Sequence, residues 1–269
     1  MKLEVLMPRL LGQTLSKPLS GYFDASLRRL RAWSCAALGC SDDCFSDGGV
    51  HVLPRPEPRY ENDLFGGNAF RMLSFGNGTV MSVAPKMLDA CRAFTSERAD
   101  TLFEGEAVQR ISALCREAGE RLEISNVHFL FREGAPCPRC PEGFEYLVWE
   151  RDELERLYAL CQRESFRNAF AYSREKDVLA VTALKDGRIV AAAGCDDRIR
   201  GLWQVGVDTL PDFRGQGLSA WLTRRMAEEC AARGETIFYS TWPANLASYR
   251  TAIRAGFLPV NFELGSTKA

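Results

Sequence analysis

A run of β-strand character in the C-terminal half of the chain leads into Arg214, Gly215 and Gly217. An amphipathic helical pattern begins directly after them, with Leu218 on its apolar side. Glycine lets the main chain approach a bulky anion closely. The N–H groups of a first helical turn point at such an anion, and the helix dipole adds to the attraction. Residues 207–219 therefore predict a binding loop for a diphosphate.

The same residues differ from two other phosphate-binding motifs. The dinucleotide fingerprint has three glycines and a later acidic residue that holds a ribose, and this segment has two glycines and no such acid. The Walker motif needs Gly-Lys-Ser/Thr, which is absent from the loop. A helix-capping turn without a ligand would also explain Gly215 and Gly217, so the loop alone does not assign a function.

Composition excludes several classes of partner. The 269 residues include 34 basic and 35 acidic side chains, for a net charge of −1, so no general attraction for nucleic acid or anionic membrane is expected. Glu4 and Pro8 interrupt the first apolar run, which is unlike a signal peptide. No apolar stretch reaches the length that spans a bilayer. We therefore expect a cytoplasmic protein that binds neither nucleic acid nor membrane.

The elements that position the loop are predicted to lie in the second of two domains. Pro and Gly are dense in residues 133–143, which predicts a boundary near residue 140. Residues 1–140 are expected to form a smaller α/β accessory domain. Residues 141–269 are expected to be α+β, with a central mixed sheet flanked by helices. Strands are predicted at 146–150, 178–185, 188–194, 202–207, 236–241 and 258–262, with helices at 152–162, 218–233 and 246–255.

Two ordered elements give this domain a family resemblance. Residues 211–218, Pro-Asp-Phe-Arg-Gly-Gln-Gly-Leu, resemble the R/Q-x-x-G-x-G/A loop of the GNAT superfamily of N-acetyltransferases. Residues 245–248, followed by Ala-Gly-Phe at 255–257, resemble the helix and final strand of that family, N-x-x-S…G-F. The resemblance covers about residues 145–265. The upstream half suits members that carry an N-terminal extension domain.

The resemblance implies acetyl-CoA as the cosubstrate. The main-chain amides of residues 214–219 would hold its pyrophosphate, and the backbone at Leu210 would pair with the pantetheine arm, in a slot between strands 202–210 and 236–241. Asn245 would contact the pantetheine region, and Ser248 would lie near the CoA phosphates. The cofactor-binding residues implied are Thr209, Leu210, Phe213, Arg214, Gly215, Gln216, Gly217, Leu218, Ser219, Asn245 and Ser248.

Alternatives and departures accompany this assignment. Asn245 is also a good N-cap for the helix that follows, and Ser248 could be an exposed polar residue. Ser219 stands where the family has Gly or Ala. Ala252 stands where many members have a tyrosine that protonates the departing thiolate. Tyr249, one turn earlier on the same helix face, is the candidate to replace it, although a surface tyrosine is an equally natural interpretation.

Acyl transfer needs a neutral amine, a polarised thioester carbonyl and an acid for the thiolate. The chain's two histidines, His51 and His128, lie upstream in strand-like runs and are interpreted as hydrogen-bonded structural residues. A carboxylate must therefore act as the base. Asp208, at the end of a strand beside the expected thioester, is the first candidate, with a turn cap toward Pro211 as the alternative. A main-chain N–H near Thr209 or Leu210 would polarise the carbonyl.

The roles of three further residues, Asp196, Asp197 and Cys195, are not decided by the sequence. Asp196 and Asp197 are reserve bases or a subsite for a cationic substrate, and Cys195 could in principle form an acyl-enzyme. The family's usual route is direct transfer in a ternary complex, here to a small-molecule amine. The alternative, motivated by Ala252, is a catalytically weak or inactive acyl-CoA-binding sensor or interaction module.

The ten cysteines are expected to be reduced thiols, with no metal bound. The alternative is a structural zinc held by Cys137 and Cys140 together with Cys40 and Cys44.

Overall fold

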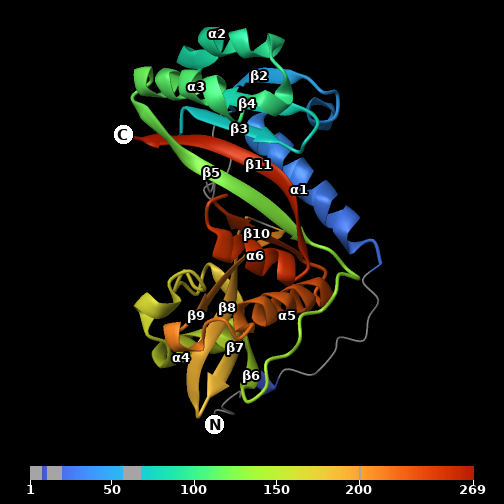
Figure 1. The fold of residues 1–269 in the computed structure, drawn as a ribbon, viewed down its shortest axis with the longest axis vertical. Helices are drawn as coiled ribbons and strands as arrows, with labels where there is room; N and C mark the ends of the chain where they lie inside the picture. The colour runs from blue at the N-terminus through green and yellow to red at the C-terminus, as the bar shows by residue number, and fades with distance from the viewer. Residues whose placement is uncertain (1–7, 11–19, 57–67, 200) are drawn as a thin grey trace. The chain divides into compact units, whose positions relative to one another are not determined.

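A computed structural model describes residues 8–10, 20–56, 68–199 and 201–269 (Figure 1). The chain divides by its internal contacts into two units. The first unit comprises Met1–Ser26, Leu130–Tyr239 and Ala247–Leu258, and the second comprises Leu27–Phe129, Ser240–Leu246 and Pro259–Ala269. In the described part of the chain, no helix is both long and apolar enough to cross a bilayer.

The first unit is built on a mixed sheet with strand order β1-β6-β7-β8-β9-β10. Neighbours from β1 to β9 are antiparallel, whereas β10 is parallel to β9. Helix α5 packs against β7, β8 and β9. The elements are β1 (Arg9–Leu10), β6 (Glu145–Glu150), α4 (Leu154–Leu160), β7 (Asp177–Lys185), β8 (Arg188–Ile199), β9 (Leu202–Thr209), α5 (Leu218–Ala232), β10 (Thr236–Thr241) and α6 (Leu246–Arg254). The predicted α+β class with a mixed sheet is confirmed.

The β7–β8 hairpin turns at Asp186 and Gly187. Their φ values are +51° and +74°, as a tight hairpin turn with two left-handed residues requires. The turn lies between the predicted strands 178–185 and 188–194. It places β8 in register between β7 and β9, so that β9 delivers its last residues to the start of α5.

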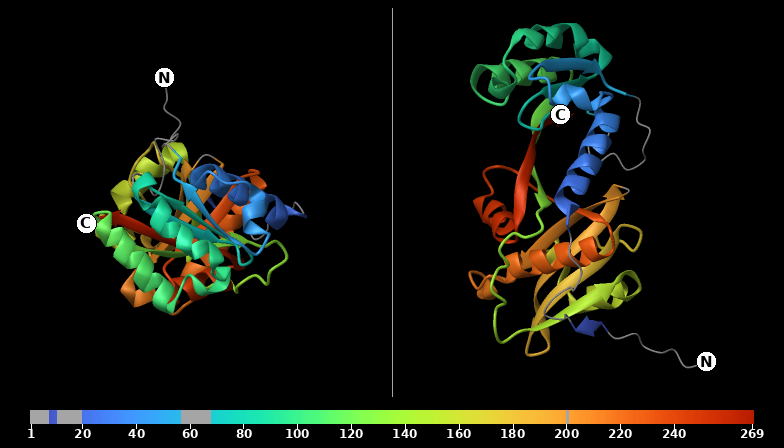
Figure 2. Two further views of the ribbon diagram at one scale, coloured as in Figure 1. Left: turned by 90° about the horizontal axis from the view of Figure 1, so that it is seen from above. Right: turned by 90° about the vertical axis from the view of Figure 1, so that its right-hand side faces the viewer.

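The second unit has the strand order β5-β11-β3-β4-β2. One face of its sheet packs on α2 and α3 through a core that includes Phe70, Met72 and Ile111. The other face packs on α1 and includes Leu38 and Leu73; Figure 2 gives two further views of these elements. The elements are α1 (Tyr22–Leu38), β2 (Val50–Pro54), β3 (Phe70–Ser74), β4 (Thr79–Val83), α2 (Leu88–Cys91), α3 (Gly105–Glu117), β5 (Glu120–Phe131) and β11 (Phe257–Lys268).

Short 3-10 turns connect these elements. They lie at Asp42–Phe45, Pro85–Met87, Arg92–Ser96, Ala99–Thr101, Arg151–Glu153, Arg163–Phe166 and Pro211–Phe213.

The last strand is longer than predicted. Local pattern indicated residues 258–262, whereas β11 continues to Lys268 because residues 262–265 pair with β3. The chain passes between the two units within α1, β5, β10, α6 and β11. Residue 140 lies inside the segment Leu130–Tyr239 of the first unit, and a division into domains 1–140 and 141–269 stays a prediction.

Candidate active site

The β9–α5 loop presents bare main chain to solvent. Gly215 and Gly217 have φ values of +79° and +87°, and residues 214–217 are exposed. A Cβ at Gly215 would meet no atom within 4 Å, and one at Gly217 would meet only a carbon of Pro141, at 3.9 Å. Glycine is therefore required at both positions by the positive φ. Crowding by neighbouring atoms is not the reason.

The loop ends at the N-terminus of α5, a helix of 15 residues. Its first intrahelical bond runs from the N–H of Trp221 to the carbonyl of Gly217, at 3.0 Å. The N–H groups of Leu218, Ser219 and Ala220 precede that bond, so they have no acceptor within the helix. Together with the helix dipole they favour an anion in front of the loop. The geometry fits the diphosphate that the sequence predicts.

Side chains tie the strand end to the helix start. The hydroxyls of Thr209 and Ser219 lie 2.8 Å apart, and Arg214 Nε donates to the Thr209 carbonyl at 3.1 Å. Ser219, which departs from the family pattern, thus has a structural partner. Arg214 is exposed, and its guanidinium is partly engaged by its own loop.

The parallel ladder between β9 and β10 stops short of the end of β9. It runs from Leu202–Thr236 to Val205–Tyr239 in the described chain, whereas β9 continues to Thr209. On its other edge β9 remains paired with β8, where the N–H of Leu210 donates to Val190 at 2.9 Å. Antiparallel bonding alternates, so the main-chain groups of Thr209 point away from β8 and toward the edge that β10 leaves open.

This edge corresponds to the slot expected between the two strands. It also distinguishes the two main-chain N–H groups that could polarise the carbonyl, those of Thr209 and Leu210. The N–H of Leu210 is already used by Val190, whereas that of Thr209 lies on the open side. A carbonyl oxygen held here would therefore meet the Thr209 amide.

Asp208 holds a neighbouring segment against the sheet. Its Oδ2 accepts the main-chain N–H groups of Asn168 and Ala169, at 2.7 and 2.9 Å, and its Oδ1 accepts the Asn168 side-chain amide at 2.7 Å. An ionised carboxylate has about four acceptor sites, so these three bonds leave one on Oδ1. The expected alternative, a cap toward Pro211, is not the contact observed. The segment that Asp208 holds lies elsewhere in the chain.

Two facing glycines make room for that segment. Gly194 and Gly206 are register partners on β8 and β9. A Cβ at Gly206 would lie 1.8 Å from the Asn168 carbonyl oxygen, and one at Gly194 would lie 2.2 Å from that of Ala169. Residues 168–169 were overlooked in the sequence. Glycine inside two adjacent strands was the signal for a close backbone approach.

The reserve carboxylates are engaged by arginines. Asp196 takes Nε and Nη2 of Arg198 at 3.0 and 2.8 Å, and Asp197 takes Arg151 at 2.6 Å. The arginines neutralise both carboxylates, which disfavours them as a subsite for a cationic substrate.

Cys195 is a poor candidate nucleophile. It is buried, with its sulfur 3.9 Å from that of Cys230. Burial raises the pKa of the Cys195 thiol well above its usual value, and the thiol rather than the reactive thiolate therefore predominates.

Helix α6 carries the remaining predicted residues. Asn245 directly precedes α6, as expected of an N-cap, and Tyr249 is half-buried within it. Ala252 is fully buried, so the position of the family's tyrosine faces packed atoms. Ser248 is not simply an exposed polar residue, because its hydroxyl lies 2.7 Å from that of Tyr239.

Tyr239 was overlooked in the sequence. It stands on β10 at the last rung of the ladder with β9. Burial raises the pKa of its hydroxyl, with a smaller contribution from the Asp208 charge, whereas the Ser248 hydroxyl opposes the rise. The hydroxyl is therefore protonated at neutral pH and can donate a proton. A tyrosine inside a predicted strand gives no sequence signal that it could act as an acid.

The histidines are hydrogen-bonded, as predicted: His51 Nε2 lies 3.0 Å from Asp47, and His128 Nδ1 lies 2.7 Å from Asn261 Oδ1. Among the residues that the structure describes, no group of three or more His, Cys, Asp or Glu side chains is arranged to hold a metal ion.

The family model described as GNAT acetyltransferase matches residues 146–261. No curated protein matches the chain in sequence. A putative acetyltransferase of the GNAT family from Novosphingobium aromaticivorans is 22% identical, over 56% of this chain and 68% of its own, with a TM-score of 0.41. A GCN5-related N-acetyltransferase-like protein from Streptococcus suis is 15% identical, over 90% of this chain and 99% of its own, with a TM-score of 0.46.

Proposed function

We propose that residues 146–261, which the GNAT acetyltransferase family model matches, transfer an acetyl group from acetyl-CoA to the amine of a small molecule. The transfer is direct, within a ternary complex. The β9–α5 loop carries the proposal, because its exposed glycines and free first-turn N–H groups suit a diphosphate. A cytoplasmic location stays a prediction.

The binding residues follow from the order of the elements. The amides of residues 214–219 face the pyrophosphate, with Gly215 and Gly217 giving it access. The open edge of β9 at Thr209 receives the pantetheine arm, and Leu210, whose N–H is bonded to Val190, borders it through its side chain. Phe213, Gln216, Leu218, Asn245 and Ser248 complete the proposed set. These are main-chain contacts for the most part, so side-chain substitutions in the loop act through backbone shape and added charge.

Asp208 is proposed as the general base, through the acceptor site that remains on Oδ1. It takes the proton of the ammonium, directly or through one water, and the neutral amine attacks the thioester. Asp208→Asn should lower kcat while acetyl-CoA affinity is kept. Asn168→Ala removes one bond to Asp208 but keeps the carboxylate, and it separates the two roles: equal losses in both variants would show that Asp208 acts only by holding residues 168–169.

For the general acid we propose two candidates, Tyr239 and Tyr249. Tyr239 is favoured by its place where β9 and β10 part and by its contact with Ser248. A phenol there can deliver a proton to the departing thiolate, which leaves as the thiol of CoA.

The proposal is tested by following thiol release from acetyl-CoA in the presence of a panel of small amines. At least one amine should raise the rate at least tenfold above the amine-free hydrolysis, with an acetylated product seen by mass spectrometry. Binding of CoA without stimulation by any amine would instead support an acyl-CoA sensor. Absence of CoA binding would refute both functions.

A further inference from the structure

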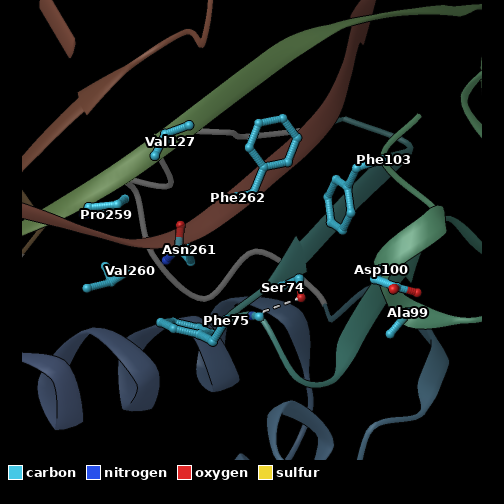
Figure 3. Close-up of a pocket in the computed structure, with 11 residues that line it drawn as sticks. Ser74, Phe75, Ala99, Asp100, Phe103, Val127, Pro259, Val260, Asn261 and Phe262 are labelled. Atoms are coloured by element: carbon cyan, nitrogen blue, oxygen red, sulfur yellow. Dashed lines mark hydrogen bonds between the residues drawn. The ribbon is translucent and has the colours of Figure 1, made fainter. Parts of the chain in front are cut away.

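A cavity of about 460 Å³ lies within the second unit (Figure 3). Four separate segments line it: the end of β3 with its turn, the 3-10 turn before α3, strand β5 and the start of β11. Cavities of this size hold small molecules in proteins. The lining residues are Ser74, Phe75, Gly76, Ala99, Asp100, Phe103, Val127, Pro259, Val260, Asn261 and Phe262.

The walls are mostly apolar and include three phenylalanines, Phe75, Phe103 and Phe262. The rings of Phe103 and Phe262 meet edge to face with centroids 5.0 Å apart, and Val127 and Val260 add aliphatic surface. Among the described residues that line the cavity, none is Lys, Arg or His. The single charged one, Asp100, is exposed, and Arg98 bonds both of its oxygens, at 3.0 and 2.5 Å. Nothing here would compensate the charge of an ionic ligand.

Two buried polar side chains interrupt the apolar lining, and the hydroxyl of one, Ser74, already donates to the Gly78 carbonyl and accepts the Gly76 N–H. Asn261 is 6% exposed, and its Oδ1 lies 2.7 Å from His128 Nδ1. An amide oxygen only accepts, so the imidazole donates and the orientation of the amide is fixed. The Nδ2 of Asn261 is buried and has no hydrogen-bond partner among the described residues. Buried donors are nearly always paired in proteins, so an orphan donor in a cavity wall indicates a missing acceptor.

A buried network keeps this donor in place. His128 Nε2 lies 3.5 Å from Glu263 Oε2, and Arg71 Nε donates to Glu263 Oε1 at 2.6 Å. The guanidinium of Arg71 also stacks over the ring of Trp33, 5.3 Å from its centroid. These groups come from α1, β3, β5 and β11, so the imidazole that bonds the Asn261 amide is itself held by several elements.

We propose that the cavity is a binding site for an uncharged, predominantly aromatic or aliphatic small molecule that carries a carbonyl oxygen, which accepts a hydrogen bond from Asn261 Nδ2. The site is separate from the acetyl-CoA loop, since every lining residue belongs to the second unit. The second unit is thereby a ligand-binding module in its own right.

The first experiment uses the full chain and the neutral dye 6-propionyl-2-(dimethylamino)naphthalene, an aromatic ketone whose emission shifts to the blue in apolar surroundings. Titration should give a saturable blue shift. Val127→Phe fills the cavity and should weaken binding at least tenfold. Val108→Phe, on α3 outside the lining, is the matched control and should bind as the wild type does. Where Val127→Phe fails to fold, Ala99→Val narrows the same cavity.

The second experiment tests the hydrogen bond by competition against the dye. Acetophenone and isopropylbenzene have the same number of heavy atoms and differ by the carbonyl. Acetophenone should compete at least fivefold better than isopropylbenzene, and benzoate should not compete. Asn261→Leu should abolish the difference between the two neutral ligands, a ratio that overall destabilisation does not mimic.

Three outcomes would overturn the proposal. They are the absence of a saturable shift with the wild type, equal dye affinity in the wild type and the folded cavity-filling variant, and equal competition by acetophenone and isopropylbenzene. Tighter binding of benzoate would refute the assignment to an uncharged ligand. None of these results depends on acetyl transfer.

Discussion

The β9–α5 loop of the first unit and the cavity of the second unit are opposite kinds of site. The loop is exposed, formed by consecutive residues, and offers main-chain donors at a helix N-terminus. The cavity is lined mostly by apolar side chains, three of them phenylalanines, from four segments and offers one buried amide. The loop suits a highly charged ligand, whereas the cavity suits an uncharged one. The charge of a ligand can thus be inferred from the donors that a site presents, before any ligand is known.

The two units also differ in the kind of group that bonds a carboxylate. In the first unit the Asp208 carboxylate is met mainly by main-chain N–H groups. In the second unit the Glu263 carboxylate is met by the side chains of Arg71 and His128.

The largest expected effect is a loss of acetyl-CoA binding in Gly217→Glu. A carboxylate beside the diphosphate costs several kcal/mol by like-charge repulsion, or about a thousandfold in Kd. Gly187→Glu is the control, because Gly187 also has positive φ and open surroundings but lies in the β7–β8 hairpin. Calorimetry measures the affinity. Dye binding in the cavity should be unchanged. Loss of both acetyl-CoA and dye binding would contradict the assignment of two separate sites.

A smaller effect is expected within the first unit alone. Tyr239→Phe should lower kcat by about a hundredfold, the lower range for loss of a general acid, and should leave KM for acetyl-CoA within about threefold. Tyr249→Phe is the matched variant on α6 and should change kcat less than threefold. The pH–rate profile should lose its alkaline limb only in Tyr239→Phe. A large loss of kcat in Tyr249→Phe with little change in Tyr239→Phe would instead identify Tyr249 as the general acid.

The smallest effect concerns the second unit. Burial lowers the pKa of His128, aided by the Arg71 charge and opposed by Glu263 and the bond to Asn261. The unfolded chain binds this proton more readily, so the free energy of unfolding is greatest above about pH 6.5 and falls as pH drops below it. We expect a loss of about 1 kcal/mol between pH 6.5 and 5.5 by urea denaturation. An unaltered slope in His128→Gln would contradict this origin.

Residues near one another in sequence were predictable. The loop, the hairpin turn at Asp186 and Gly187, and the alternation of strands and helices in residues 146–262 all depend on local spacing. The closeness of Gly194, Gly206 and residues 168–169 does not, because it arises from strand register. The role of Asp208 in holding that segment was hidden for the same reason.

The cavity was unpredictable for a stronger reason. Its donor, Asn261, is fixed by His128 from a different strand, 133 residues away. Asparagine in an apolar run has many structural explanations, and only the buried, unpartnered Nδ2 distinguishes this one. The extension of β11 to Lys268, which brings in Glu263 and Ser266, depends equally on pairing with β3.

Strand β11 sets the timing of assembly. The main-chain N–H of Phe70 donates to the Ser266 hydroxyl at 3.0 Å, across 196 residues of sequence. During synthesis, β3 and β4 therefore leave the ribosome long before the strand that completes their sheet. The second unit contains most of the early residues, but its sheet is complete only after the last residues, those of β11, have been synthesised. A fragment ended near residue 140 would leave β3 with a bare edge, open to pairing with other chains.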